Sequence, residues 1–119
     1  MPTDPTGFIP LKPVEFLLLL ALVEEEQHGY GLVQELSERT DGAVQLEPGN
    51  LYRVLKRLVT QGLIAPAARR PVAELEDERR RYYRLTPLGA RVASLEAQRL
   101  RALLASNAVQ ALGRLVKAT

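Results

Sequence analysis

The chain has 119 residues, a net charge of +2 and a hydrophobic fraction of 46%, values that are typical of one globular domain and argue against a disordered chain. It contains no cysteine, which excludes disulfides and thiolate metal sites. The start of the chain lacks the basic and apolar regions of a secretory signal, and the apolar run 16–23 is far shorter than the roughly 20 residues that span a bilayer. We therefore expect a cytoplasmic protein with no membrane segment, no metal and no cofactor.

The first third of the chain predicts an arm and two helices. Residues 1–10 contain three prolines and a glycine, a composition that predicts a flexible N-terminal arm. A helix should begin near Pro13, because proline suits the first helical position, and should end near Gln27. Its residues are apolar almost all round, which predicts a central core helix. A second helix is expected from about Tyr30 to Thr40.

A third helix is predicted between Pro48 and Gln61, with Gly62 directly after it. Apolar residues recur in it at helical spacing, and the rest of its surface is basic and polar, with no acidic residue after Glu47. The inner face would consist of Leu51, Val54, Leu55 and Leu58, and the outer face of Asn50, Arg53, Lys56 and Arg57.

Two strand candidates, at 63–68 and 80–85, flank a charged loop at 69–79 and predict a β-hairpin with a long tip. Pro66 should confine the first strand to a sheet edge. Thr86 and Pro87 predict the start of a final helix that continues to Val116. So long a helix extends beyond a small domain, and a second copy of the chain is the simplest partner for its apolar side. We expect it to join a homodimer through Leu88, Val92, Leu95, Leu103, Leu104, Leu112 and Leu115.

This order of elements predicts a mainly α fold with a small β-hairpin. A winged helix-turn-helix domain would occupy residues 11–85, and a C-terminal dimerisation helix would occupy residues 86–119. A basic helix of this kind fits the major groove of double-stranded DNA, and arginines beside it can bind phosphates. The sequence therefore favours a DNA-binding protein.

Three stretches carry a family resemblance: HGYGLVQEL at 28–36, LEPGNLYRVLKRLVTQGLI at 46–64 and RRYYRLTPLG at 80–89. Together, and in this order, they resemble the PadR family of transcriptional regulators over about residues 11–100, and the short chain looks like the family's small members. The resemblance implies a homodimer formed by the C-terminal helix with help from the first helix. It also implies a palindromic operator and repression that a small apolar or aromatic effector relieves. Small members that bind flat aromatic drugs stack them on a tryptophan, and this chain has none.

The candidate DNA contacts come from the third helix, the base of the hairpin and the start of the second helix. Asn50 lies where such helices meet base edges, and Lys56 suits a phosphate. Tyr52 would contact DNA or would pack on its own helix, and His28 would cap the second helix or lie on the surface. The full set is Tyr30, Pro48, Gly49, Asn50, Tyr52, Arg53, Lys56, Arg57, Arg69, Arg70, Arg79 and Arg80.

The tip of the hairpin departs from the family's short basic wings. Glu74, Glu76, Asp77 and Glu78 lie in it, and acidic residues near phosphates are unfavourable. The arginines at its base are therefore the better candidates for DNA contact.

Two alternatives remain open. A MarR-like regulator shares the hairpin and the dimer, but such proteins devote more of the chain to dimerisation helices at both ends. A winged-helix module that binds a protein partner without DNA would suit the acidic tip and the modest net charge. We do not expect an enzyme, because the sequence offers no catalytic constellation; the consecutive glutamates 24–26 do not face one another on a helix.

Overall fold

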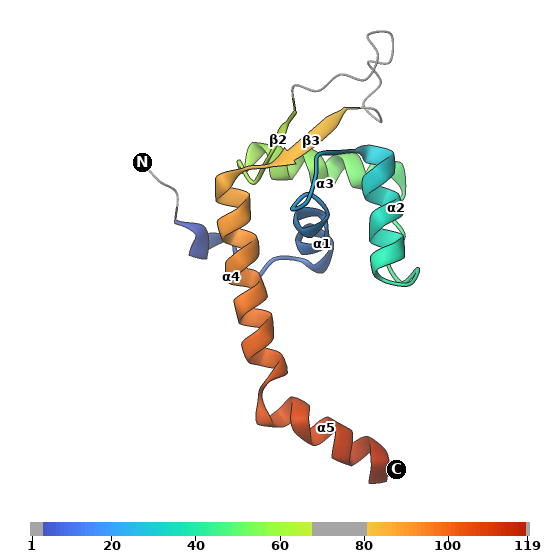
Figure 1. The fold of residues 1–119 in the computed structure, drawn as a ribbon, viewed down its shortest axis with the longest axis vertical. Coiled ribbons are helices and arrows are strands. Elements are labelled where there is room, and N and C mark those ends of the chain that lie inside the picture. The colour runs from blue at the N-terminus through green and yellow to red at the C-terminus, as the bar shows by residue number, and fades with distance from the viewer. Residues whose placement is uncertain (1–3, 68–80, 119) are drawn as a thin grey trace.

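The computed structural model describes residues 4–67 and 81–118. These form a helical head with a small sheet, from which two further helices project, so the molecule measures 60 × 38 × 22 Å (Figure 1). The mainly α fold with a small sheet is confirmed. In chain order the elements are the 3₁₀ helix η1 (Pro5–Phe8), α1 (Pro13–Ala21), β1 (Gln27–His28), α2 (Gly29–Arg39), α3 (Pro48–Thr60), β2 (Ile64–Pro66), β3 (Tyr82–Leu85), α4 (Pro87–Leu104) and α5 (Asn107–Ala118).

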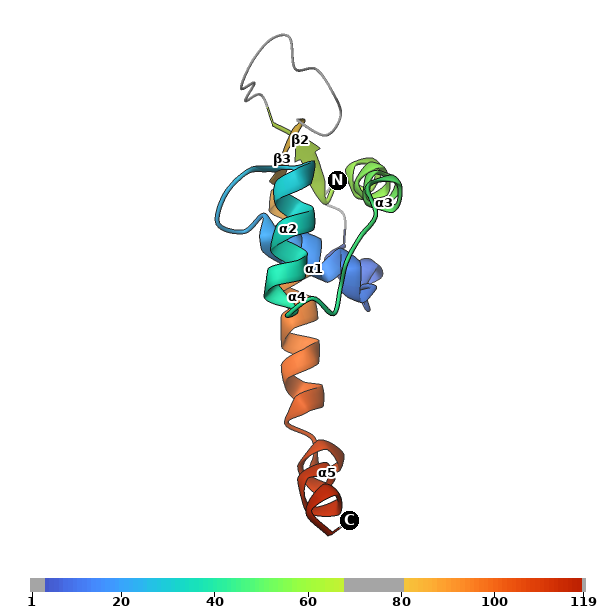
Figure 2. The same cartoon turned by 90° about the vertical axis from the view of Figure 1, so that its right-hand side faces the viewer.

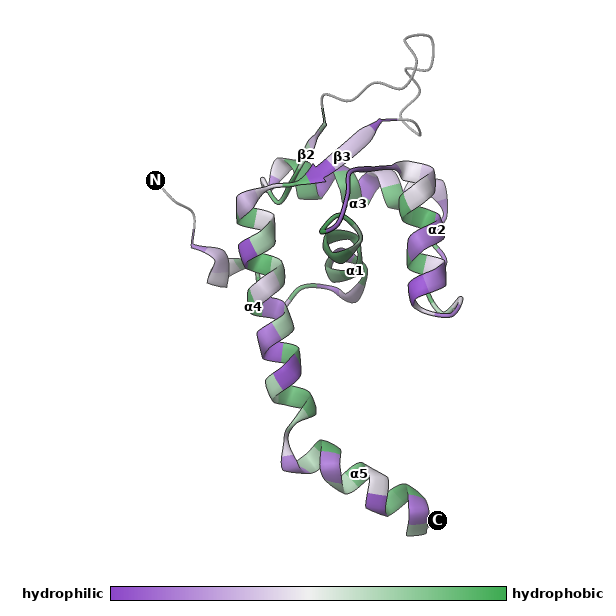
Figure 3. Cartoon of the chain, viewed as in Figure 1, coloured by the Kyte–Doolittle hydropathy of each residue, from purple (hydrophilic) through white to green (hydrophobic). Residues whose placement is uncertain are grey.

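The helix α1 lies at the centre of the head, as its apolar sequence predicts. It is hydrophobic over nearly its whole length, and α2, α3 and the upper part of α4 surround it (Figures 1 and 3). Removing these leucines from water is the main favourable contribution to the folding free energy. Side chains with no exposed surface come from all four helices and include Leu18, Leu19, Leu32, Leu36, Leu55, Leu58 and Val92.

The helix α1 ends at Ala21, earlier than the predicted end near Gln27. The amide of Gln27 explains the difference, because its Nε2 donates to the carbonyl oxygen of Ala21 (2.8 Å), which has no partner within the helix. Three consecutive glutamates follow at 24–26, and negative charge is unfavourable at a helix C-terminus. The prediction that the helix continues to Gln27 is therefore wrong.

The sheet has three antiparallel strands in the order β1-β3-β2, where the sequence predicted a two-stranded hairpin. Gln27 pairs with Tyr83 on one side of β3, and Pro66 pairs with the same residue on the other side. Pro66 therefore lies in an edge strand, as predicted. The strand β1 has two residues, too few for an alternating pattern that the sequence could show.

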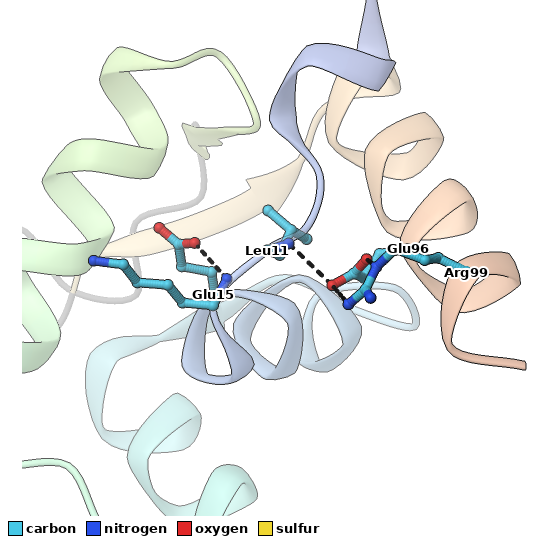
Figure 4. Close-up of polar contacts among 5 residues, drawn as sticks. Leu11, Glu15, Glu96 and Arg99 are labelled. Carbon is cyan, nitrogen blue, oxygen red and sulfur yellow. Dashed lines mark hydrogen bonds and ion pairs between the residues drawn. The ribbon is translucent and has the colours of Figure 1, made fainter. Parts of the chain in front are cut away.

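The N-terminal segment lies against the domain where residues 4–10 are described, and its flexibility stays a prediction. The helix η1 contacts α4, and Phe8 and Ile9 pack against the core. The backbone N–H of Leu11 then donates to Oε2 of Glu96 on α4 (3.0 Å; Figure 4). Apolar side chains thus pack this segment against the domain in spite of its prolines.

Glu96 on α4 is a buried carboxylate that forms an ion pair with Arg99. The residue is 1% exposed, and both of its carboxylate oxygens accept hydrogen bonds from the guanidinium of Arg99, at 2.6 and 3.0 Å. These bonds lower the pKa of Glu96 against the opposing effect of burial, and the backbone N–H of Leu11 lowers it further. The same pairing raises the pKa of Arg99. Glu96 is therefore ionised in the folded chain at neutral pH.

The C-terminal region forms two helices, so the prediction of one helix from Pro87 to Val116 is wrong. Its predicted start is confirmed, since the hydroxyl of Thr86 accepts the N–H of Gly89 (3.0 Å). The first helix, α4, ends at Leu104, and the hydroxyl of Ser106 accepts the N–H of Val109 (3.4 Å), which begins α5 (Figure 2). A serine hydroxyl that binds a backbone N–H favours a new helix start over a continued helix.

Candidate nucleic-acid interface

The helix α3 presents a polar face to solvent, as predicted. It begins at Pro48 and ends before Gly62, whose φ of +79° is a conformation that glycine adopts without strain. Leu51, Leu55 and Leu58 are buried against the core, which turns the opposite side of the helix outward. Pro48, Gly49, Asn50, Arg53, Lys56 and Thr60 are all exposed.

A basic groove lies between α3 and the sheet. Its volume is about 570 Å³, and its cationic residues are Arg53 and Lys56 from α3 and Arg81 from the residue before β3. Among the described residues that line it, none is acidic. The described residues that line it are Tyr52, Arg53, Lys56, Val59, Thr60, Pro66, Arg81 and Tyr83, and we call this set the basic groove.

Arg81 and Thr60 were not among the residues that the sequence singled out. Arg81 precedes Tyr83 by two residues, so the alternation of an extended chain places both side chains on the same face. That pattern was available in the sequence, but Arg81 was hidden in a run of three arginines at 79–81.

Arg57 differs from its neighbours on α3. Its Nη2 donates to Oε2 of Glu15 on α1 (2.9 Å), and the side chain is 41% exposed. The sequence of α3 has no acidic residue on this side, and the acid that pairs with Arg57 comes from another helix. Arg57 is thus held by an ion pair within the chain, and its contact with DNA stays a prediction.

Three aromatic or imidazole side chains lie where α2 begins, close to α3. Tyr52 is half-buried and packs on Gly29, where an added Cβ would lie 3.0 Å from its hydroxyl oxygen. Tyr30 is exposed. The Nδ1 atom of His28 accepts the N–H of Gly31 (3.1 Å), so the capping interpretation of His28 is confirmed. Tyr52 thus packs against the start of α2 and not on its own helix, and its contact with DNA stays a prediction.

Four predicted contacts lie outside the described residues: Arg69, Arg70, Arg79 and Arg80. The acidic tip at 74–78 lies outside them as well. Within the described ranges no group of three or more histidine, aspartate or glutamate side chains could hold a metal ion. No described helix is long and apolar enough to cross a membrane.

The predicted dimer residues divide into two groups. Val92 has no exposed surface in its own chain, and Leu88 and Leu95 are half-buried, so Val92 belongs to the core and its assignment to a surface between subunits is corrected. The other side chains, at the end of α4 and on α5, expose more than half of their area. These are Leu103, Leu104, Leu112 and Leu115, and Val116 joins them.

These features define a winged helix-turn-helix protein: three helices, a small sheet whose last two strands form the wing, and a basic third helix beside that wing. The family model of the PadR-like transcriptional regulators matches residues 18–95, and the chain belongs to this family. This membership confirms the family resemblance that the three sequence stretches indicated. It also excludes the alternative of a MarR-like regulator.

Individual relatives agree with this assignment. The chain is 31% identical over 77 residues to an uncharacterized protein X of Lysinibacillus sphaericus, a match that covers 64% of this chain and 67% of that protein. A PadR family transcription regulator from Clostridium difficile R20291 is 22% identical with a TM-score of 0.66, covering 88% of this chain and 99% of its own. RosR of H. salinarum is 24% identical with a TM-score of 0.63, covering 93% and 94%. These two structures support the fold.

Proposed function

We propose that this chain is a cytoplasmic transcriptional repressor that binds a palindromic operator in double-stranded DNA as a homodimer. The observation that carries the proposal is the basic groove, where Arg53, Lys56 and Arg81 converge from two elements beside an exposed helix. The major groove, about 12 Å wide, admits a helix, and cations beside such a helix neutralise phosphates. The helix α3 would therefore enter the major groove while the basic groove holds one phosphate backbone.

The roles of the side chains follow from their places on α3. Gly49 and Asn50 lie exposed in its first turn, where recognition helices reach base edges. Lys56 and Arg81 suit phosphates, since they lie further along the basic groove. Arg53 lies between these positions and is suited to a guanine or to a phosphate.

The proposal of a homodimer rests on the exposed apolar side chains of α4 and α5. The helix α5 has 12 residues, none of them buried in its own chain, and an isolated helix of that length is marginal in water. A second copy of the chain would cover Leu112 and Leu115 and stabilise the helix. Two-fold symmetry then predicts DNA half-sites about 34 Å apart.

The proposed effector is a small apolar or aromatic molecule that relieves repression. We place it between the winged helix domain and the C-terminal helices, where apolar faces of two subunits would meet. The chain contains no tryptophan, so stacking on that side chain does not contribute to its recognition.

Selection of bound sequences from a random DNA pool, followed by affinity measurements against salt, tests the DNA proposal. Each phosphate contact contributes a log–log slope of about −0.9, so Lys56→Gln and Arg81→Gln should each make the slope less steep by about that amount. Arg114→Gln is the matched control, because α5 lies at the opposite end of the molecule from α3 (Figure 1). Failure of the natural chain to bind any DNA at low salt would instead support a protein-interaction module.

A further inference from the structure

Glu15 is the buried carboxylate nearest to α3. It lies in the first turn of α1, is 9% exposed, and both of its oxygens accept hydrogen bonds. Oε1 accepts the backbone N–H of Lys12 (3.0 Å), and Oε2 accepts Nη2 of Arg57 (2.9 Å). One carboxylate therefore joins the start of α1 to the last turn of α3.

The partner of Glu15 lies on one flank of α3. With about 100° per residue, Arg57 lies about 40° around the helix from Arg53 and about 140° from Tyr52. On the other flank Tyr52 packs against Gly29, where its hydroxyl is 3.0 Å from an added Cβ. The buried leucines hold the apolar face of α3 against the core, and these two flanking contacts act together with them to set the rotation of α3 about its axis.

We propose that Glu15 is a positioning residue for DNA recognition. It holds Arg57 against α1 and so turns Arg53 and Lys56, the cations of the basic groove, toward DNA. This inference rests on the proposed DNA-binding function. It assigns to Arg57 a role inside the protein and leaves base and phosphate contact to its neighbours.

The size of the effect follows from helix geometry. A helical side chain ends about 6 Å from the helix axis, so a rotation of about 20° moves its end by about 2 Å. A hydrogen bond to a base edge does not survive such a shift, because its length varies by only about 0.5 Å. Rotation of α3 therefore costs sequence-specific contacts, whereas mobile lysine and arginine side chains keep their attraction to phosphates.

Glu15 is itself held in place by the segment that precedes it. Leu11 lies between two carboxylates, with Glu96 on the side of α4 and Glu15 on the side of α1 (Figure 4). The backbone N–H groups of Leu11 and Lys12, which are adjacent in the chain, each donate to one of them. The frame that positions Arg57 thus extends from α4 through α1 to α3.

Glu15→Gln tests the proposal, because it keeps the volume and an oxygen for the Lys12 N–H but removes the charge that holds Arg57. We expect the affinity for the selected DNA sequence to fall about tenfold, the equivalent of one base contact, and the affinity for scrambled DNA to change less than about twofold. Glu38→Gln on α2 is the matched control, since it removes one exposed negative charge and should change neither affinity. Thermal unfolding confirms that each variant is folded at the assay temperature.

Arg57→Gln is a second test of the proposal, because Arg57 is partly exposed and its replacement leaves the core intact. It should reproduce the loss seen with Glu15→Gln, and the double variant should lose no more than either single variant. Its salt slope should equal that of the natural chain, whereas Lys56→Gln should change the slope by about 0.9.

Three results would overturn the positioning role while leaving DNA binding in place. They are an unchanged affinity of Glu15→Gln for the selected sequence, additive losses in the double variant, and a reduced salt slope for Arg57→Gln. If the natural chain binds no DNA at all, the proposed function fails first and the positioning role fails with it.

Discussion

Gly89, in the first turn of α4, lies against the backbone carbonyl of Leu63, so closely that an added Cβ would be 1.9 Å from the carbonyl oxygen. The backbone N–H of Thr86 donates to the same oxygen (3.2 Å), and the Thr86 hydroxyl donates to the carbonyl of Gly62 (2.6 Å). The start of α4 is thereby joined to the chain that leads from α3 into β2.

Replacement of Gly89 by alanine should lower the free energy of unfolding by roughly 3 kcal/mol, because backbone cannot yield to the added methyl group as a flexible side chain would. Urea unfolding followed by circular dichroism measures the change. Gly113→Ala is the control, since nothing lies within 4 Å of a Cβ there, and it should be neutral or slightly stabilising. Equal unfolding midpoints for Gly89→Ala and the natural chain would contradict the close approach.

His28→Ala should lower the free energy of unfolding by about 1 kcal/mol, the usual effect of losing a helix cap. The imidazole Nδ1 accepts the N–H of Gly31, and the ring also contacts Tyr82 edge to face, at a centroid distance of 5.3 Å. His28→Asn keeps a capping acceptor and should recover much of the loss in thermal unfolding. If the two variants are equally destabilised, the ring contact with Tyr82 is the dominant contribution.

The stability of the chain should depend on Glu96 at acidic pH. Hydrogen bonds from Arg99 lower the pKa of Glu96 in the folded chain, whereas the pKa of a glutamate in an unfolded chain is about 4.3. A lowered folded pKa contributes stability that is fully present above the unfolded pKa and is lost as the pH falls through the folded pKa. Between neutral pH and about pH 5 the contribution is therefore constant, and below about pH 4 it declines.

Glu96→Gln should accordingly be less stable than the natural chain at pH 7, and the difference should shrink as the pH falls below about 4. Thermal unfolding between pH 2 and pH 7 measures it. Glu24→Gln removes an exposed carboxylate and serves as the control. A difference between Glu96→Gln and the natural chain that stays constant over the whole range would exclude the ionised Glu96–Arg99 pair as its cause.

Leu112→Glu with Leu115→Glu should convert the proposed dimer to a monomer, because both side chains are more than half exposed within one chain and need a partner to be covered. Sedimentation velocity measures the molecular mass. Gln110→Glu adds charge to α5 on the side of the helix away from Leu112, and it should leave the dimer intact. A dimer that persists in the double leucine variant would place the interface elsewhere.

Features that depend on neighbours in the chain were predictable. Pro48 and Gly62 set the bounds of α3, Thr86 capped α4, and Pro66 marked an edge strand, because each acts through its own backbone. The exposed polar face of α3 followed from its helical periodicity.

Features that join distant parts of the chain could not be predicted. Glu15 is 42 residues from Arg57, and Leu11 is 85 residues from Glu96, so no spacing rule relates them. The ion pair between Arg57 and Glu15 therefore has no signal in the sequence. Val92 is a second example. Helical periodicity identifies the apolar face of a helix, but it does not show whether that face packs against its own chain or against a second copy.

The central position of β3 has a consequence for the segment that carries α2 and α3. The strand β1 directly precedes α2, β2 follows α3, and both pair with β3. Residues 27–66 therefore form a closed loop whose ends are joined through a third strand. Lengthening the connection between the two helices, at 40–47, leaves those ends where they are, and the entropic cost of a longer loop grows only slowly with length. The fold can thus accept insertions between α2 and α3 while the sheet keeps its register.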